Sequence, residues 1–133
     1  MRKKSVVIVI LALGLVALFA VSAAPSLACS PGYYKNHLSV WTGGVTIGGN
    51  WGYTESVHYT QKQALAWMNS PVVGDKSYTG FFIVATAWLN GGPVDPEASE
   101  WVNMHPPGSG IAASSSLWQD IEPNMIDIAS YFN

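Results

Sequence analysis

The chain has 133 residues, of which 49% are hydrophobic, with six Lys and Arg against eight Asp and Glu. Beyond residue 28 only Lys35, Lys62 and Lys76 oppose the eight acidic residues, which leaves residues 29–133 at a net charge of −5. Binding to phosphate backbones depends on clustered Lys and Arg, so this composition excludes a nucleic acid as the expected partner. The length suits one domain with a modest core.

The first element in chain order is a leader. Residues 2–4 are Arg-Lys-Lys, residues 6–21 carry no charge, and small residues follow up to Ala28. This order is typical of a secretory signal peptide. Ser26 and Ala28 place small residues at both positions that cleavage requires, so the sequence predicts a signal peptide over residues 1–28, a mature start at Cys29 and a secreted or cell-surface location.

Two alternatives to simple cleavage concern the membrane. Counted through Ala24, the apolar stretch approaches the roughly 20 residues that span a bilayer, which suits an uncleaved anchor. Cys29 follows small residues, as in a lipoprotein, although Ser26 stands where leucine is usual. One cysteine cannot form an internal disulfide, so in an oxidising compartment Cys29 is free, lipidated or bonded to another chain. Membrane contact is expected only with an anchor or a lipid.

The segment over residues 29–52 is rich in glycine and aromatic residues, and its only β-prone run is Val45-Thr46-Ile47, closed by two glycines. It predicts irregular structure with a short hairpin at most. A helix is then predicted from the N-cap Thr60, because Gln63 three residues on completes a capping box, and Pro71 ends it.

Three more helical segments are predicted. Residues 79–90 are apolar almost all round, which indicates a central buried helix. Asp95-Pro96-Glu97 supplies an N-cap, a first-turn proline and an acidic first turn for a helix that ends near Met104. Ser116 and Gln119 start the last segment, which Pro123 kinks or restarts. We therefore expect one mainly α domain over residues 29–133, with about four helices and an aromatic, loop-rich start.

Catalytic motifs are scarce. The sequence contains no His-Glu-x-x-His, no Gly-x-Ser-x-Gly and no phosphate-binding glycine loop. We interpret Glu97 and Glu100 as charges that favour a helix start, and Asp75 as a turn or capping residue instead of a calcium ligand. His37, His58 and His105 are widely spaced. The sequence thus predicts no metal, no cofactor and no catalytic residues, and favours a non-enzyme while an extracellular hydrolase stays open.

Aromatic residues gather in the loop-rich segment. Exposed rings stack on sugar faces or anchor protein interfaces, whereas buried rings would complete a small core. Both readings stay open. The lysine, asparagine and histidine between these rings form either a site or a buried hydrogen-bonded clasp, and we favour the clasp because loop amides need partners. The candidate binding or interface residues are Tyr33, Tyr34, Lys35, Asn36, His37, Trp41 and Trp51, with Cys29 for a disulfide or a lipid.

The opening run Ser-Pro-Gly-Tyr-Tyr-Lys-Asn-His over residues 30–37, followed by Trp41, resembles the start of an uncharacterised family of secreted and surface-displayed prokaryotic domains. That family opens with Thr or Ser, Pro-Gly, Tyr or Phe, then Trp-Lys-Asn-His. Further resemblance lies in residues 45–49, 59–65, 71, 74–75, 88–90, 105–110 and 131–133. Tyr34 departs from the usual tryptophan, and residues 50–58 look like an insertion.

The resemblance implies an extracellular or envelope location and no established activity. We therefore expect a surface structural protein, for example a self-assembling filament or layer subunit. Its expected partners are further copies of itself or other surface proteins. The alternative is a carbohydrate-binding or adhesive module that uses exposed rings, with glycans as partners.

Overall fold

A computed structural model describes residues 29–41, 43–49, 54–70, 74–91 and 94–132. Residues Cys29–Ser130 form one compact unit, and only Tyr131 and Phe132 of the second unit lie among the described residues. The leader falls outside the described residues. Within the described part of the chain, no helix has the length and apolar character to cross a membrane.

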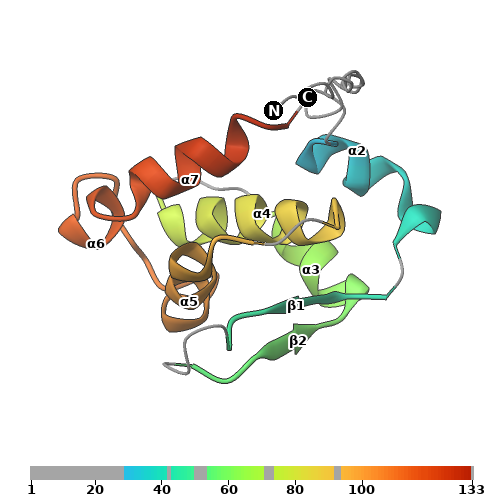
Figure 1. Cartoon of the computed structure of the whole chain (residues 1–133), viewed down its shortest axis with the longest axis horizontal. Helices are drawn as coiled ribbons and strands as arrows, with labels where there is room; N and C mark the ends of the chain where they lie inside the picture. Colours follow the sequence, from blue (N-terminus) through green and yellow to red (C-terminus); the bar gives the residue numbers. More distant parts are fainter. Residues whose placement is uncertain (1–28, 42, 50–53, 71–73, 92–93, 133) are drawn as a thin grey trace, which may run out of the picture. The chain divides into compact units, whose positions relative to one another are not determined.

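The described unit is mainly helical with one small hairpin, as predicted. Figure 1 shows the elements in chain order. They are α2 (Pro31–Asn36), the 3-10 helix η4 (Leu38–Val40), β1 (Val45–Ile47), β2 (Val57–Tyr59), α3 (Gln61–Met68), α4 (Lys76–Leu89), α5 (Pro96–Met104), α6 (Ser116–Gln119) and α7 (Glu122–Ala129).

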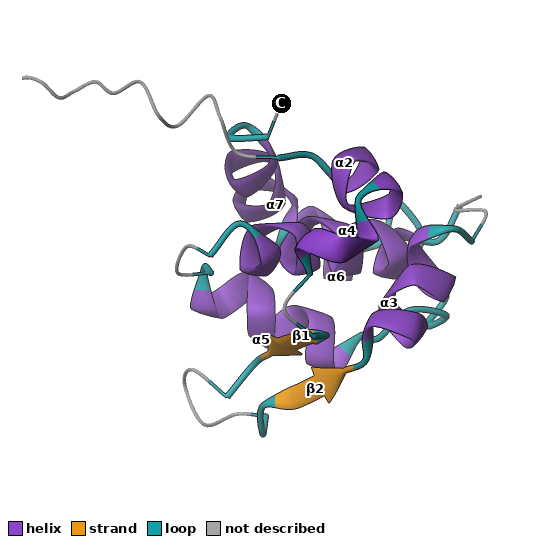
Figure 2. Ribbon diagram, turned by 90° about the vertical axis from the view of Figure 1, so that its right-hand side faces the viewer, coloured by secondary structure: helices purple, strands orange, loops and turns teal. Residues whose placement is uncertain are grey.

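Helix α4 is the centre of the core, which confirms the central buried helix. Phe81, Val84 and Ala85 on this helix are fully buried. Helices α2, α3, α5 and α7 and strand β1 all pack against it, and Figures 1 and 2 show α4 between them. The Phe81 ring meets Tyr59 and Trp67 edge to face, with centroids 5.4 and 5.0 Å apart. This aromatic cluster joins the hairpin and α3 to α4.

Local capping explains where α3 and α5 begin. Thr60 Oγ1 accepts from the Gln63 amide at 3.2 Å, as the capping box predicts. Asp95 caps α5, with Pro96 in its first turn, and the helix ends at Met104 as expected. Pro123 restarts the last helical segment instead of kinking it, because α6 and α7 are separate helices with Pro123 in the first turn of α7. The expectation of Ser116 as the N-cap of this segment was wrong by one residue, because Ser115 caps α6 and Ser116 is its first residue.

The opening segment is more regular than its composition suggests. Ser30 caps α2 and Pro31 stands in its first turn, the combination of signals that also starts α5. The hairpin exists, but its second strand comes from residues expected to be an insertion: Val45 pairs with Tyr59 and Ile47 with Val57, antiparallel. Gly44 is required beside it, since a Cβ there would lie 1.8 Å from the Tyr59 carbonyl oxygen.

Candidate functional site

The opening motif divides into an inward and an outward side of α2. Tyr34 and Trp41 are 5% and 8% exposed, so both belong to the core. The indole Nε1 of Trp41 donates to the Tyr34 carbonyl at 3.1 Å, and the two rings meet edge to face. These two candidate binding residues therefore fix α2 and η4 to the domain and present no ring for a ligand.

The outward side carries the other residues of the motif. Lys35, Asn36 and His37 are exposed, so the predicted clasp is hydrogen-bonded but not buried. Asn36 Nδ2 donates to the Gly32 carbonyl at 3.0 Å, and His37 Nδ1 lies 2.8 Å from the Tyr33 carbonyl oxygen. The expectation of burial was wrong because Asn36 and His37 bond to carbonyls one turn back, while Lys35 donates to the Met68 carbonyl of α3 at 3.5 Å from an exposed position.

Tyr33 and His37 form a stacked pair on this face. Their ring centroids are 4.1 Å apart and the planes differ by 11°. Tyr33 is half-buried, while Leu38 and Val40 of the adjoining η4 are 49% and 45% exposed. The face therefore combines a partly covered ring with bare aliphatic side chains. Trp51, the remaining aromatic candidate, lies outside the described residues.

Asn90 holds the start of the domain in place. Its Oδ1 accepts from the Cys29 amide at 2.8 Å and from the Tyr34 hydroxyl at 3.0 Å. Its Nδ2 donates to the carbonyls of Cys29 and Thr86 at 2.9 and 3.0 Å. Burial raises the pKa of Tyr34, and the neighbouring Cys29 thiol raises it further. Cys29 is thus half-buried and held at its backbone.

A second polar cluster joins α5 to the connection between the two strands. Glu100 is 2% exposed, and its Oε1 accepts from the Thr54 amide and hydroxyl at 2.8 and 2.6 Å. Asn103 Nδ2 donates to the Ile47 carbonyl at 2.6 Å, while its Oδ1 accepts from the Tyr59 hydroxyl at 3.0 Å. The interpretation of Glu100 as a helix-start charge was wrong, because it is a buried acceptor for a distant loop.

Asp75 is a capping residue, as expected, and it also fixes a second loop. Its Oδ1 accepts from the amide and hydroxyl of Ser77 at 2.9 and 2.6 Å, which caps α4. The amides of Gly110 and Ile111 donate to the same carboxylate at 3.0 and 3.1 Å. Burial alone would raise the pKa of Asp75, but the hydrogen bonds from Ser77, Ile111 and Gly110 lower it below its usual range.

The histidines lie apart in the described fold. His58 pairs with Thr46 across the hairpin at 3.1 Å, and His105 packs at a tilt on Trp101. Burial lowers the pKa of His105. In the described ranges no three His, Cys, Asp or Glu side chains gather closely enough to hold a metal ion.

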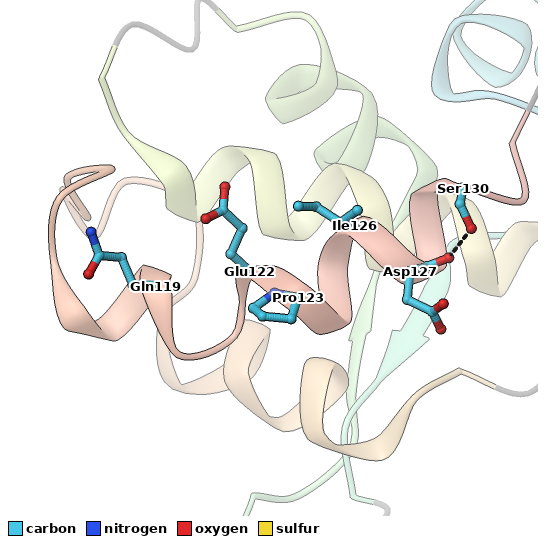
Figure 3. Close-up of a pocket in the computed structure, with 6 residues that line it drawn as sticks. All are labelled: Gln119, Glu122, Pro123, Ile126, Asp127 and Ser130. Atoms are coloured by element: carbon cyan, nitrogen blue, oxygen red, sulfur yellow. Dashed lines mark hydrogen bonds between the residues drawn. The ribbon is translucent and has the colours of Figure 1, made fainter.

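An open hollow lies along the outer side of α6 and α7. It has a volume of about 490 Å³, and Figure 3 shows its lining. Ile126, which is 61% exposed, points to the same side of α7 as Glu122, whereas Asp127 points to the other side. The Ser130 hydroxyl donates to the Asp127 carbonyl at 2.6 Å. The hollow therefore combines a bare aliphatic side chain with negative charge. Its lining residues are Gln119, Glu122, Pro123, Ile126, Asp127 and Ser130.

Sequence reasoning missed three of these features. The sequence predicts no role for Asn90 or Asn103, and it does not mark Ile126 as exposed. Their roles depend on contacts or exposure set by residues far along the chain, and no local pattern marks them.

Comparisons with protein-family models, with curated proteins and with solved structures found no match to this chain. The resemblance of the opening motif to a surface-protein family therefore stays a prediction. What the chain can do has to be inferred from its own surface and its own buried groups.

Proposed function

We propose that this chain is a secreted or cell-surface structural protein whose copies associate into a filament or layer. The leader supports export. The observation that carries the self-association is the placement of the exposed aliphatic side chains. Leu38 and Val40 lie on η4, and Leu117 and Ile126 lie on α6 and α7. In Figure 1, η4 and α6 lie on opposite sides of the described unit, and α7 runs from α6 towards α2. Val57 on β2 and Met104 on α5 are exposed as well. Exposed apolar side chains on separate surfaces suit a subunit with two neighbours.

The burial of most of the described candidate aromatic rings favours the structural proposal over glycan binding. Tyr34 and Trp41, two of the candidate binding residues, lie in the hydrophobic core, as does Tyr59. A sugar-binding platform needs an exposed ring face. Among the described candidates only Tyr33 remains partly open, and it is stacked on His37.

The roles of the acidic residues support a structural function over catalysis. Asp75 and Asp95 cap helices, and buried Glu100 accepts hydrogen bonds from Thr54. A general acid or base needs a carboxyl group within reach of a substrate. The oxygen atoms of these three carboxylates instead accept hydrogen bonds from other groups of the domain.

Sedimentation velocity of the protein purified from full-length expression tests this proposal. Over a rising concentration series, with and without reductant, we expect the mean sedimentation coefficient to increase as copies associate. A protein that stays monomeric throughout would contradict it. A glycan-array hit that Tyr33→Ala abolishes would instead support the carbohydrate-binding alternative.

A further inference from the structure

Two of the three described lysines lie near each other, and the third, Lys76, lies over the Trp118 ring of α6. Lys35 on α2 and Lys62 on α3 are both exposed, and the two helices pack together. The Gln61 side chain donates to the Leu38 carbonyl at 3.0 Å, which places the start of α3 beside η4. Exposed Leu38 and Val40 therefore share one end of the domain with these two lysines. We call this the basic end, defined by Lys35, Leu38, Val40 and Lys62.

A second surface, along α7 and the start of α5, is acidic. Glu122, Asp127 and exposed Ile126 all line the hollow on α6 and α7. Asn124 of α7 donates to the side chains of Asp95 and Glu97 at 2.9 and 3.2 Å, so the start of α5 adds two more carboxylates nearby. We call this the acidic end, defined by Glu97, Glu122, Ile126 and Asp127.

We propose that the basic end of one copy binds the acidic end of the next, with Leu38 and Val40 against Ile126 and the lysines facing Glu122 and Asp127. This rests on the proposed function and names the partner as a second copy of this chain. Like ends would repel each other, so a symmetric contact between two identical ends is disfavoured. A head-to-tail contact leaves one free end on every copy, and it therefore extends into a polymer or closes into a ring.

The hollow and the charges act in different ways in such a contact. Covering Ile126 with an aliphatic side chain removes apolar surface from water, which supplies affinity. The charge pairs at the rim supply orientation and speed of association, and salt weakens them because solvent-exposed pairs are screened over about 8 Å at physiological ionic strength. Association should therefore weaken, without vanishing, as salt is raised.

Two single charge reversals with matched controls test the contact. Asp127→Lys alters the acidic end, and Glu55→Lys makes the same charge change at an exposed position before β2. Lys35→Glu alters the basic end, and its control is Lys76→Glu, which makes the same charge change outside the basic end, over the Trp118 ring of α6, where added negative charge should not weaken the contact. Sedimentation measures the association constant of each variant, and circular dichroism checks that each one is folded.

We expect Asp127→Lys and Lys35→Glu each to weaken association at least tenfold, and both controls to change it less than threefold. Mixing the two end variants should restore association, because the reversed ends match each other. If the unaltered protein associates but the end variants behave like the controls, or if mixing restores nothing, this interface is wrong while the proposed function stands. If the unaltered protein never associates, the proposed function itself fails.

Discussion

The two halves of the domain are held together by different means. In residues 60–130 the helices begin at local caps such as Thr60, Asp75 and Asp95. In residues 29–59 the backbone depends on side chains from far along the chain: Asn90 binds Cys29 and Asn103 binds Ile47, over separations of 61 and 56 residues. The first half is thus ordered by the second, and it should be the more sensitive to single substitutions at those contacts.

The largest effect is expected at Gly44. A Cβ at this position would lie 1.8 Å from the Tyr59 carbonyl oxygen and 2.9 Å from the Thr60 Cα, both of them backbone atoms that cannot rotate away. We expect Gly44→Ala to lower the free energy of unfolding by more than about 4 kcal/mol, enough to unfold a small domain. Urea denaturation followed by tryptophan fluorescence measures it.

Gly32→Ala is the matched control for that change. Gly32 lies within α2, and the nearest atom to a Cβ there is Ser30 Oγ at 3.8 Å, an ordinary contact. Alanine favours helix over glycine by up to about 1 kcal/mol, so this variant should be as stable as the original or more stable. Equal losses at the two glycines would show that the hairpin is not the point of close approach.

The next largest loss of stability is expected at Asn90 and Asn103, whose side chains bond to residues far away in the sequence. Asn103→Ala removes the hydrogen bonds to Ile47, Glu55 and Tyr59 and leaves their partners without this side chain. Each such bond contributes about 1 kcal/mol net, so we expect a loss of about 2–4 kcal/mol, and a similar loss for Asn90→Ala. Asn36→Ala, which removes one exposed bond to Gly32, should cost less than about 0.5 kcal/mol.

Hydrogen exchange shows which part of the domain is destabilised when Asn90 or Asn103 is replaced. In Asn90→Ala and Asn103→Ala the amides of residues 29–59 should lose more protection than those of α4 and α5, because these side chains tie the first half to the second. Uniform loss of protection across both halves would contradict the division.

As the pH is lowered, the free energy of unfolding should fall in two steps, which arise from His105 and Asp75 in the second half of the domain. Burial lowers the pKa of His105, so the unfolded state takes up that proton first and stability begins to fall as the pH drops through 6.5. The hydrogen bonds of Asp75 lower its pKa despite burial, so its contribution is complete above its ordinary pKa of 3.8 and is lost as the pH falls through the lower folded value.

Matched variants separate these two steps in denaturation curves recorded across pH. His105→Gln should remove the upper step and leave the lower one. Asp75→Asn should remove the lower step and cost about 1 kcal/mol at neutral pH, because asparagine still caps a helix but one oxygen fewer is left for the amides of Gly110 and Ile111. Persistence of both steps in both variants would assign them to other groups.

The sequence predicts this fold well where the determinants are local. The caps of α3 and α5 and the apolar character of α4 are visible within a few residues, and all three helices are confirmed. Ser30-Pro31 is an N-cap residue followed by proline, like Asp95-Pro96, so the start of α2 could have been predicted by the same rule. The aromatic and glycine content around it favoured an irregular segment instead.

The rest depends on where distant residues meet. No pattern near Val57 indicates that it pairs with Ile47 across the intervening loop. The separation of lysines from carboxylates is likewise a property of the folded surface, because Lys35 and Lys62 are 27 residues apart in a sequence with no charge run. The candidate ends for association therefore emerge only once α2 and α3 are seen to pack together.

Electron microscopy combined with intact mass, on material collected from the cell surface and medium, tests the central claim of a self-associating exported subunit most directly. The account predicts ordered polymers built from chains whose mass begins at Cys29. Dispersed monomers, or chains that keep residues 1–28, would contradict it.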